Sequence, residues 1–355
     1  MRRIWSKNII AFLFCLILTE ALVRIVCWNA DLRKLIFRGD CFTEKVNWAN
    51  ECHSYPTNHE YIEYDSLLGW NNLVEYQSNN YFGQKNLLIV AKRRVHPFED
   101  SINKPEVSIF GDSFTFGEEV GDKETIPYFI QKTIKENVEN CGVPGYGLDQ
   151  ISLNLKQSHQ DKHSSKNKVI AIITDDLLRA TTEYSFFVKP KYVKTEQGTW
   201  KLISPKHNNN VLRSQYTYRL KSVMLLDLVV DRFFKCESEA VTNSYELAPW
   251  ILSQTQKDCI AHGTRLYLAL IPTPLEVKDA KAQFRYQKIS EWLEICCKET
   301  GLSYVDCAPS VDIGCFSKDQ GLHWDARVNK SIGMYLGVFL LKEIRATRKT
   351  SLRDY

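Results

Sequence analysis

The chain has 355 residues, and its 46 Lys and Arg residues against 42 Asp and Glu residues give a formal net charge of +4. A hydrophobic share of 44% with 25% charged residues is typical of globular proteins and excludes the disordered and fibrous classes. The nearly balanced charge offers no strongly basic face, so nucleic acid is not expected as a partner. The length suits one large domain or two smaller ones.

The amino terminus combines basic residues with an apolar stretch. Every residue from 9 to 18 is apolar, and a helix continuing to Trp28 would be about 30 Å long, which matches the core of a bilayer. No small-x-small cleavage site follows, so residues 1–28 are expected to form an uncleaved anchor. A cleavable signal peptide and a buried amphipathic helix are the alternatives. The positive-inside rule then predicts a single-pass inner-membrane protein whose body lies on the periplasmic side.

The 11 cysteines include no CxxC pair, so neither a zinc ribbon nor a thioredoxin-like motif is predicted. In a periplasmic body some of them are able to form disulfides, and the sequence leaves their pairing open. Cys296 and Cys297 lie in apolar surroundings, which favours buried thiols.

Residues 29–104 are aromatic, rich in Asn and without helical periodicity, and they are predicted to form an accessory or linker region. From residue 105 to residue 345 strands and helices alternate. Repeated βα units predict a parallel sheet covered on both faces. An aromatic, basic stretch at 181–244 interrupts this pattern and is expected to be an insertion, and residues 346–355 a tail. The predicted strands are 107–110, 138–141, 169–174, 266–271 and 302–306, and the predicted helices begin near 125 and 147 or cover 211–234, 287–299 and 326–344.

Ser113 stands in the segment Gly-Asp-Ser-Phe-Thr-Phe-Gly, directly after the first predicted strand. This position is the carboxyl edge of the sheet, where open α/β sheets bind ligands. A serine there can face a cleft while a base approaches from another loop. In the alternative interpretation Asp112 and Ser113 only cap a turn.

Two further loops carry candidate groups. Gly142 and Gly145 follow the second strand, and their backbone permits close approach of N–H groups to an oxyanion, although a glycine-rich βα turn would look the same. His323 precedes the last predicted helix within Lys-Asp-Gln-Gly-Leu-His-Trp-Asp. A loop histidine beside carboxylates is suited to be a general base. The alternative is a surface or capping histidine, with Asp325 as the N-cap of the helix.

These residues carry a family resemblance. The segment 111–114 resembles the first block of the SGNH (GDSL-like) hydrolases, 140–145 resembles the second, and the loop ending in His323 resembles the fifth. The likeness is greatest to membrane-anchored bacterial members, in which an Asp-Asp pair precedes an Arg, as Asp175 and Asp176 precede Arg179 here. It extends from about residue 61 to residue 341. The resemblance implies a three-layer α/β/α, flavodoxin-like sandwich with a parallel sheet.

The resemblance also implies the roles of individual residues. Ser113 would be the nucleophile and His323 its base, with the backbone N–H groups of Ser113 and Gly145 as oxyanion donors and with no metal or cofactor. The family usually has Asn where Asp175 stands, so Asp175 and Asp176 are expected as accessory groups. It also has Asp three residues before the His, where this chain has Gln. Asp319, one residue further back, is therefore the expected partner of His323, with a Ser-His dyad as the alternative.

The resulting expectation is a periplasmic serine esterase or acyltransferase that acts through an acyl-serine on ester groups, with O-acetyl groups of a surface carbohydrate as the leading candidate. The alternatives are a catalytically inactive module that binds glycan or scaffolds an envelope complex, and a lipid-active esterase. Aromatic side chains suited to stack on sugars or to pack the interior are Trp70, Tyr81, Tyr184 and Trp200. The sequence predicts no particular protein partner.

Overall fold

A computed structural model of the chain describes residues 2–28, 62–73, 76–78, 88–90, 94–95, 104–161, 164–185, 187–206, 220–223, 226, 236–312 and 322–351. The elements in chain order are α1 (Arg2–Trp28), β1 (Ile62–Asp65), β2 (Gly69–Asn72), β3 (Tyr76–Ser78), β4 (Leu88–Val90), β5 (Arg94–Val95), β6 (Val107–Gly111), α4 (Ser113–Phe116), η1 (Asp122–Glu124), α5 (Ile126–Ile134), β7 (Val138–Gly142), α6 (Leu148–Gln157), η2 (Ser158–Gln160), β8 (Asn167–Ile172), α7 (Thr174–Arg179), β9 (Lys191–Lys194), β10 (Trp200–Ile203), α10 (Cys236–Ala261), β11 (Arg265–Leu270), α11 (Pro274–Lys278), α12 (Ala280–Thr300), β12 (Ser303–Asp306), η5 (Ala308–Ser310) and α13 (Ala326–Ser351).

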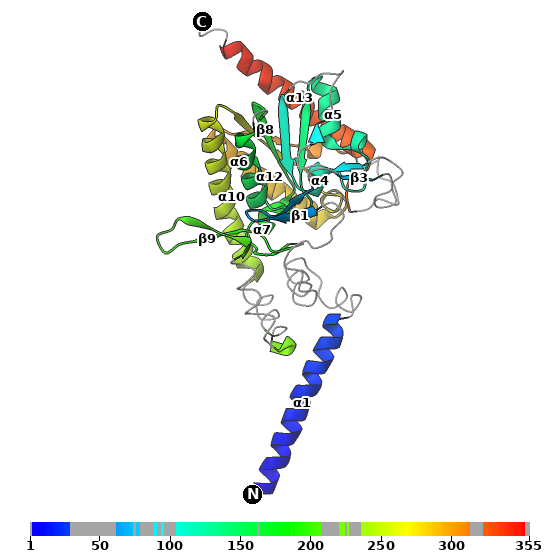
Figure 1. Cartoon of the computed structure of the whole chain (residues 1–355), viewed down its shortest axis with the longest axis vertical. Helices are drawn as coiled ribbons and strands as arrows, with labels where there is room; N and C mark the ends of the chain where they lie inside the picture. Colours follow the sequence, from blue (N-terminus) through cyan, green and yellow to red (C-terminus); the bar gives the residue numbers. More distant parts are fainter. Residues whose placement is uncertain are drawn as a thin grey trace.

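The centre of the molecule is a six-stranded sheet with the order β12-β11-β8-β6-β7-β5 (Figure 1). All neighbouring pairs are parallel except β5 with β7. Numbered along the chain, the parallel strands have the order 2-1-3-4-5, which is the flavodoxin-like arrangement. The predicted α/β fold is confirmed. The strand order reverses between β6 and β8, so the carboxyl ends of these strands mark the switch point at which such sheets bind ligands.

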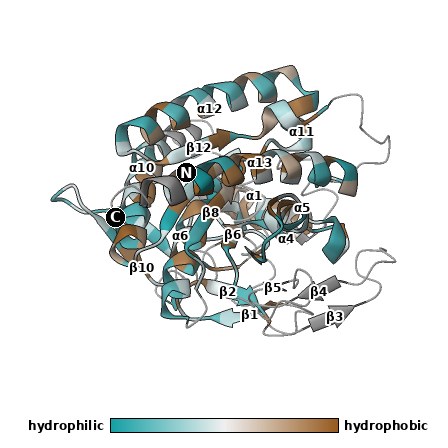
Figure 2. Ribbon diagram, turned by 90° about the horizontal axis from the view of Figure 1, so that it is seen from above, coloured by the Kyte–Doolittle hydropathy of each residue, from teal (hydrophilic) through white to brown (hydrophobic). Residues whose placement is uncertain are grey.

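Alternation along the strands divides the interior into two layers of side chains. On β11, Leu266, Leu268 and Leu270 pack in the layer that contains α6, α10 and α12, whereas Tyr267 and Ala269 face the layer that contains α5 and α13. Such two-sided burial requires apolar residues on both faces of a strand. In Figure 2 the helices α12 and α13 show both hydrophilic and hydrophobic turns, as expected for helices that cover a sheet. The structure therefore has the three predicted layers.

Several element boundaries differ from the prediction. β8 ends at Ile172 rather than 174, because Thr174 already begins α7. α12 begins at Ala280, seven residues before the predicted start at 287, because the Asp279 side chain accepts hydrogen bonds from the first backbone N–H groups of this helix. α13 continues to Ser351, so most of the predicted tail is helical. The sequence pattern also missed α10, a 26-residue helix that contains Pro249.

Within residues 29–104, the β1–β2 hairpin packs against the α/β domain. Trp70 of the β1–β2 hairpin is fully buried, and its indole N–H donates to the carbonyl of Pro144 at 3.0 Å. The Tyr146 hydroxyl donates in return to the Trp70 carbonyl at 2.5 Å. Trp70 and Tyr184 are buried and therefore have a packing role, while Tyr81 lies outside the described residues.

α1 extends away from the α/β domain (Figure 1). Its segment Asn8–Ile25 has a mean hydropathy of 2.0 with none of it buried, so by length and composition it is able to cross a membrane. A signal sequence near the amino terminus has the same length and composition. The Glu20 carboxylate accepts hydrogen bonds from the backbone N–H groups of Lys221 and Ser222, at 2.9 and 2.8 Å. The described part of the 181–244 insertion therefore touches α1. Most of the helix predicted at 211–234 lies outside the described residues.

Candidate active site

Ser113 lies at the carboxyl end of β6, in the first turn of the short helix α4. The preceding residue, Asp112, caps this helix by accepting a hydrogen bond from the Phe114 N–H at 2.9 Å. Gly117 ends it in the left-handed conformation, with φ of 89° and its N–H donating to the Ser113 carbonyl. Glycine adopts this conformation without a steric penalty. The local sequence thus holds Ser113 in a tight strand-to-helix turn at the switch point.

His323 meets Ser113 from the loop before α13. Its Nε2 atom lies 2.9 Å from the Ser113 hydroxyl oxygen, although 210 residues separate the two in sequence. The Phe114 ring packs against the imidazole, with ring centroids 4.9 Å apart. Two of the residues singled out by the sequence are therefore in hydrogen-bonding contact.

A glutamate lies at the other ring nitrogen of His323. The Glu119 carboxylate is 3.2 Å from Nδ1, and the Glu118 carboxylate is 3.3 Å from Nε2. Glu119 has a backbone φ of 69°, which is uncommon for a residue other than glycine. The sequence analysis did not single out either glutamate. Asp319, the expected partner of His323, lies outside the described residues.

The serine loop packs tightly against the end of β7. Gly111 and Gly142 are paired in the register of β6 and β7. A Cβ atom on Gly142 would lie 2.2 Å from the backbone nitrogen of Phe116. Asn140 also contacts this loop, because its side-chain amide donates to the Phe116 carbonyl at 3.2 Å. Glycine at position 142 is therefore required for the close approach that positions α4.

Gly145 lies in a tight turn after β7. The Tyr146 N–H donates to the Val143 carbonyl at 3.4 Å, Pro144 occupies the second position, and Gly145 has a φ of 78°. This is the pattern of a type II turn, which needs a positive φ at its third position. Ser185 fixes the turn by donating from its hydroxyl to the Gly145 carbonyl at 3.2 Å. The first-turn N–H of Ser113 has no partner within α4. The two expected oxyanion donors thus come from the ends of adjacent strands.

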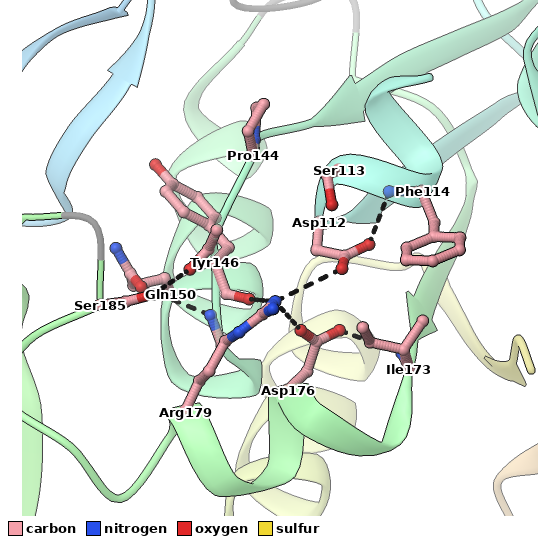
Figure 3. Close-up of polar contacts among 12 residues, drawn as sticks. Asp112, Ser113, Phe114, Pro144, Tyr146, Gln150, Ile173, Asp176, Arg179 and Ser185 are labelled. Carbon is pink, nitrogen blue, oxygen red and sulfur yellow. Dashed lines mark hydrogen bonds and ion pairs between the residues drawn. The ribbon is translucent and has the colours of Figure 1, made fainter. Parts of the chain in front are cut away.

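Arg179 connects the three loops around Ser113 (Figure 3). Its guanidinium Nη1 lies 2.9 Å from the Asp176 carboxylate, 3.5 Å from the Asp112 carboxylate and 3.4 Å from the Tyr146 carbonyl. Asp176 also caps α7 by accepting the Ile173 N–H at 3.0 Å. The Asp-Asp-Leu-Leu-Arg segment therefore contacts the serine loop through Arg179 and Asp112.

The two carboxylates in this network are buried and share one cation. Burial raises the pKa of Asp176 well above its usual value, and the neighbouring charge of Asp112 adds to the effect. Burial also raises the pKa of Asp112, although the Arg179 charge opposes the shift. Asp175 is half-buried, and its carboxylate has no hydrogen-bond partner among the described residues. Asp176 is thus tied into the scaffold, whereas Asp175 is not.

No protein-family model and no curated protein match the chain. Solved structures do resemble it. A lipolytic protein of the G-D-S-L family from Veillonella parvula is 13% identical, with 66% of this chain and 97% of that chain covered and a TM-score of 0.40. A carbohydrate esterase family 2 enzyme from Corynascus thermopiles is 11% identical, covering 70% and 69%, with a TM-score of 0.42. A carbohydrate acetylesterase from Sinorhizobium meliloti is 12% identical, covering 67% and 98%, with a TM-score of 0.37. One of these neighbours is a member of the family that the sequence motifs resemble.

Proposed function

We propose that the protein is a serine esterase of the SGNH type. The contact between the Ser113 hydroxyl and Nε2 of His323, at 2.9 Å, is the observation that carries the proposal. A serine paired with a histidine at the switch point of a flavodoxin-like sheet, where this fold binds ligands, supports the roles of nucleophile and base. No metal or cofactor takes part in the proposed reaction.

The proposed chemistry follows the geometry of the site. His323 accepts the hydroxyl proton as the Ser113 oxygen attacks the ester carbonyl, and the N–H groups of Ser113 and Gly145 donate to the oxyanion that forms. Collapse of this intermediate releases the alcohol, which takes the proton from His323, and leaves an acyl-serine. Water in hydrolysis, or a second alcohol in acyl transfer, then attacks the acyl carbon while His323 takes its proton. The bond to the Ser113 oxygen breaks, His323 returns the proton to that oxygen, and the acid or the new ester leaves.

Glu119 is proposed as the positioning residue of His323, in place of Asp319. A carboxylate at Nδ1 fixes the ring so that Nε2 faces the serine, and it stabilises the positive charge that the ring gains on taking the proton. Glu119 is in this position, at 3.2 Å from Nδ1. Glu118 lies on the Nε2 side, where it adds a second negative charge beside the same ring.

The proposed substrate is an ester of a surface carbohydrate, with O-acetyl the leading acyl group, and the proposed location is the periplasmic face of the inner membrane. The resemblance of the motifs to those of membrane-anchored bacterial SGNH proteins supports the proposed substrate. The apolar α1 supports the proposed location, and the basic residues at its start favour a cytoplasmic amino terminus. A catalytically inactive glycan-binding module is the alternative, and the Asp at position 175 and the Gln at position 320 favour it.

An esterase assay on the full-length protein in detergent tests the proposal. Hydrolysis of p-nitrophenyl acetate and release of acetate from acetylated glycans are measured for wild type, His323→Ala and Arg327→Ala. Loss of the base should lower turnover at least about 100-fold. Arg327 is exposed and pairs with Asp325, so its variant is the matched control from the same region. Substantial turnover by a folded His323→Ala variant would remove His323 as the base.

A further inference from the structure

A group of metal-ligating side chains lies outside the proposed active site. His159, Asp258 and His262 each offer one ligand atom, and these atoms lie within 4.8 Å of one another. His159 comes from η2, whereas Asp258 and His262 lie one turn apart near the end of α10. About 100 residues of chain therefore separate the two halves of the cluster, which only the fold brings together.

The cluster lies at the opposite edge of the parallel sheet from Ser113. η2 leads into β8, and α10 leads into β11, and these parallel strands are neighbours with Arg265 paired to Asn167. Both connections therefore lie at the amino ends of the strands, while Ser113 follows the carboxyl end of β6. A ligand bound here would not contact the reacting groups.

We infer that His159, Asp258 and His262 form a binding site for a divalent transition-metal ion, with Zn²⁺ as the best match. The His159 Nε2 atom lies 3.4 Å from one Asp258 carboxylate oxygen, and the His262 Nδ1 atom lies 3.8 Å from the other. Ligand atoms that share a tetrahedral ion at about 2.0–2.1 Å are separated by about 3.4 Å. Two imidazoles and a carboxylate are ligands that zinc prefers over Mg²⁺ or Ca²⁺.

The burial of His159 favours this use. Its side chain is only 3% exposed, so the ring is held in place by the residues packed around it. One Asp258 carboxylate oxygen is buried without a hydrogen-bond partner among the described residues, although it faces His159. An ion between them would satisfy this oxygen.

Other groups lie close enough to the cluster to affect metal binding. The Cys259 sulfur is 3.9 Å from His159 Nε2, but Cys259 is not one of the three residues whose ligand atoms gather within 4.8 Å. The Lys168 ammonium opposes a bound cation, although it is held by the Ser158 and Ser164 hydroxyls at 2.7 and 2.8 Å. His262 Nδ1 lies 2.8 Å from the Asp258 carbonyl oxygen, and the His159 and His262 rings stack in parallel with centroids 4.3 Å apart. Metal binding therefore requires the half-exposed His262 side chain to leave this contact and turn a ring nitrogen toward the ion. The ion would link the end of α10 to the start of β8.

Metal titration of the untagged, full-length protein in detergent tests the site. After chelator treatment and dialysis, Zn²⁺ binding is followed by calorimetry, and Co²⁺ binding by the visible absorption of a tetrahedral complex. We expect one ion per chain. His262→Ala and Asp258→Asn should each weaken Zn²⁺ binding at least about tenfold. Mutation of a residue that only hydrogen-bonds to a metal ligand already lowers affinity by about 10–100-fold, and loss of a ligand itself should cost at least as much.

Two controls separate this site from others. Lys257→Ala changes an exposed neighbour on α10, and His323→Ala removes the histidine of the proposed active site, so both should bind Zn²⁺ as wild type does. Zn²⁺ should also raise the thermal unfolding temperature of wild type but not of the site variants. Absence of Zn²⁺ binding by wild type, or a loss below tenfold in either site variant, overturns the inference. None of these readouts depends on esterase activity.

Discussion

The carboxylate of Glu119 lies 3.2 Å from Nδ1 of His323, although 204 residues separate the two in sequence. This contact completes a line of polar groups that runs from Glu119 through His323 to Ser113. Glu119 makes this contact from a backbone in the left-handed region, with φ of 69°.

Glu119→Gln should lower kcat without unfolding the domain. The amide cannot stabilise an imidazolium, and it favours a ring whose proton is on the wrong nitrogen; removal of the corresponding carboxylate in serine proteases lowers kcat by about 10⁴, so we expect a loss of about 10²–10⁴. Asp319→Asn is the matched variant and should leave kcat nearly unchanged. A large loss in Asp319→Asn with little loss in Glu119→Gln would assign the positioning role to Asp319.

Gly142→Ala should destabilise the domain and lower esterase activity together. The added Cβ would meet the backbone nitrogen of Phe116 at 2.2 Å, so α4 or β7 must move, and overpacking of this kind costs about 1–3 kcal/mol. Gly198→Ala is the control. Unlike Gly142, Gly198 has a positive φ of 76°, so this variant carries backbone strain, but no heavy atom lies within 4 Å of the added carbon and turnover should stay at the wild-type level. Urea unfolding and turnover are measured for both. An active Gly142→Ala protein of wild-type stability would show that the close approach is not required.

Asp176→Asn should change how stability depends on pH. Because the pKa of Asp176 is raised well above its ordinary value of 3.8, the folded state retains a proton that the unfolded state has lost. The free energy of unfolding contributed by this group is therefore greatest at low pH and declines as pH rises toward the raised pKa. The Asn variant has no proton to release and should show a smaller decline. Urea titrations at pH 5 and pH 8 measure the difference, and equal declines in both proteins would contradict the assignment.

Deletion of residues 1–28 should release the protein from membranes. The apolar segment Asn8–Ile25 is the proposed anchor, so full-length protein should sediment with the membrane fraction and resist extraction by carbonate. Replacing Leu13 and Ile17 with Ala, which keeps the segment apolar, is the control and should leave fractionation unchanged. Recovery of full-length protein in the soluble fraction would contradict the proposed anchor, and an amino terminus shortened by processing would indicate a signal peptide.

The sequence predicts those parts of the structure that depend on local pattern. Apolar strands followed by helices indicate the parallel sheet, and the glycines around Ser113 and Gly145 mark the turns at its edge. The sequence does not predict the β1–β2 hairpin, because the burial of Trp70 against Pro144 is a long-range contact. The role of Glu119 is not visible in the sequence, because its contact with His323 joins residues that are 204 positions apart. The cluster of His159 with His262 depends wholly on the pairing of β8 with β11.

The reactivity of Ser113 is the central claim, and labelling with a fluorophosphonate probe measures it most directly. The probe forms a covalent bond only with a serine that an adjacent base activates, so it reports the nucleophile without knowledge of the substrate. The full-length wild type in detergent should be labelled, and both Ser113→Ala and His323→Ala should not, while Arg327→Ala should be labelled as wild type is. Circular dichroism confirms that each variant is folded. Absence of labelling in the folded wild type, or labelling that persists in Ser113→Ala, would contradict the account and favour a glycan-binding module without catalytic activity.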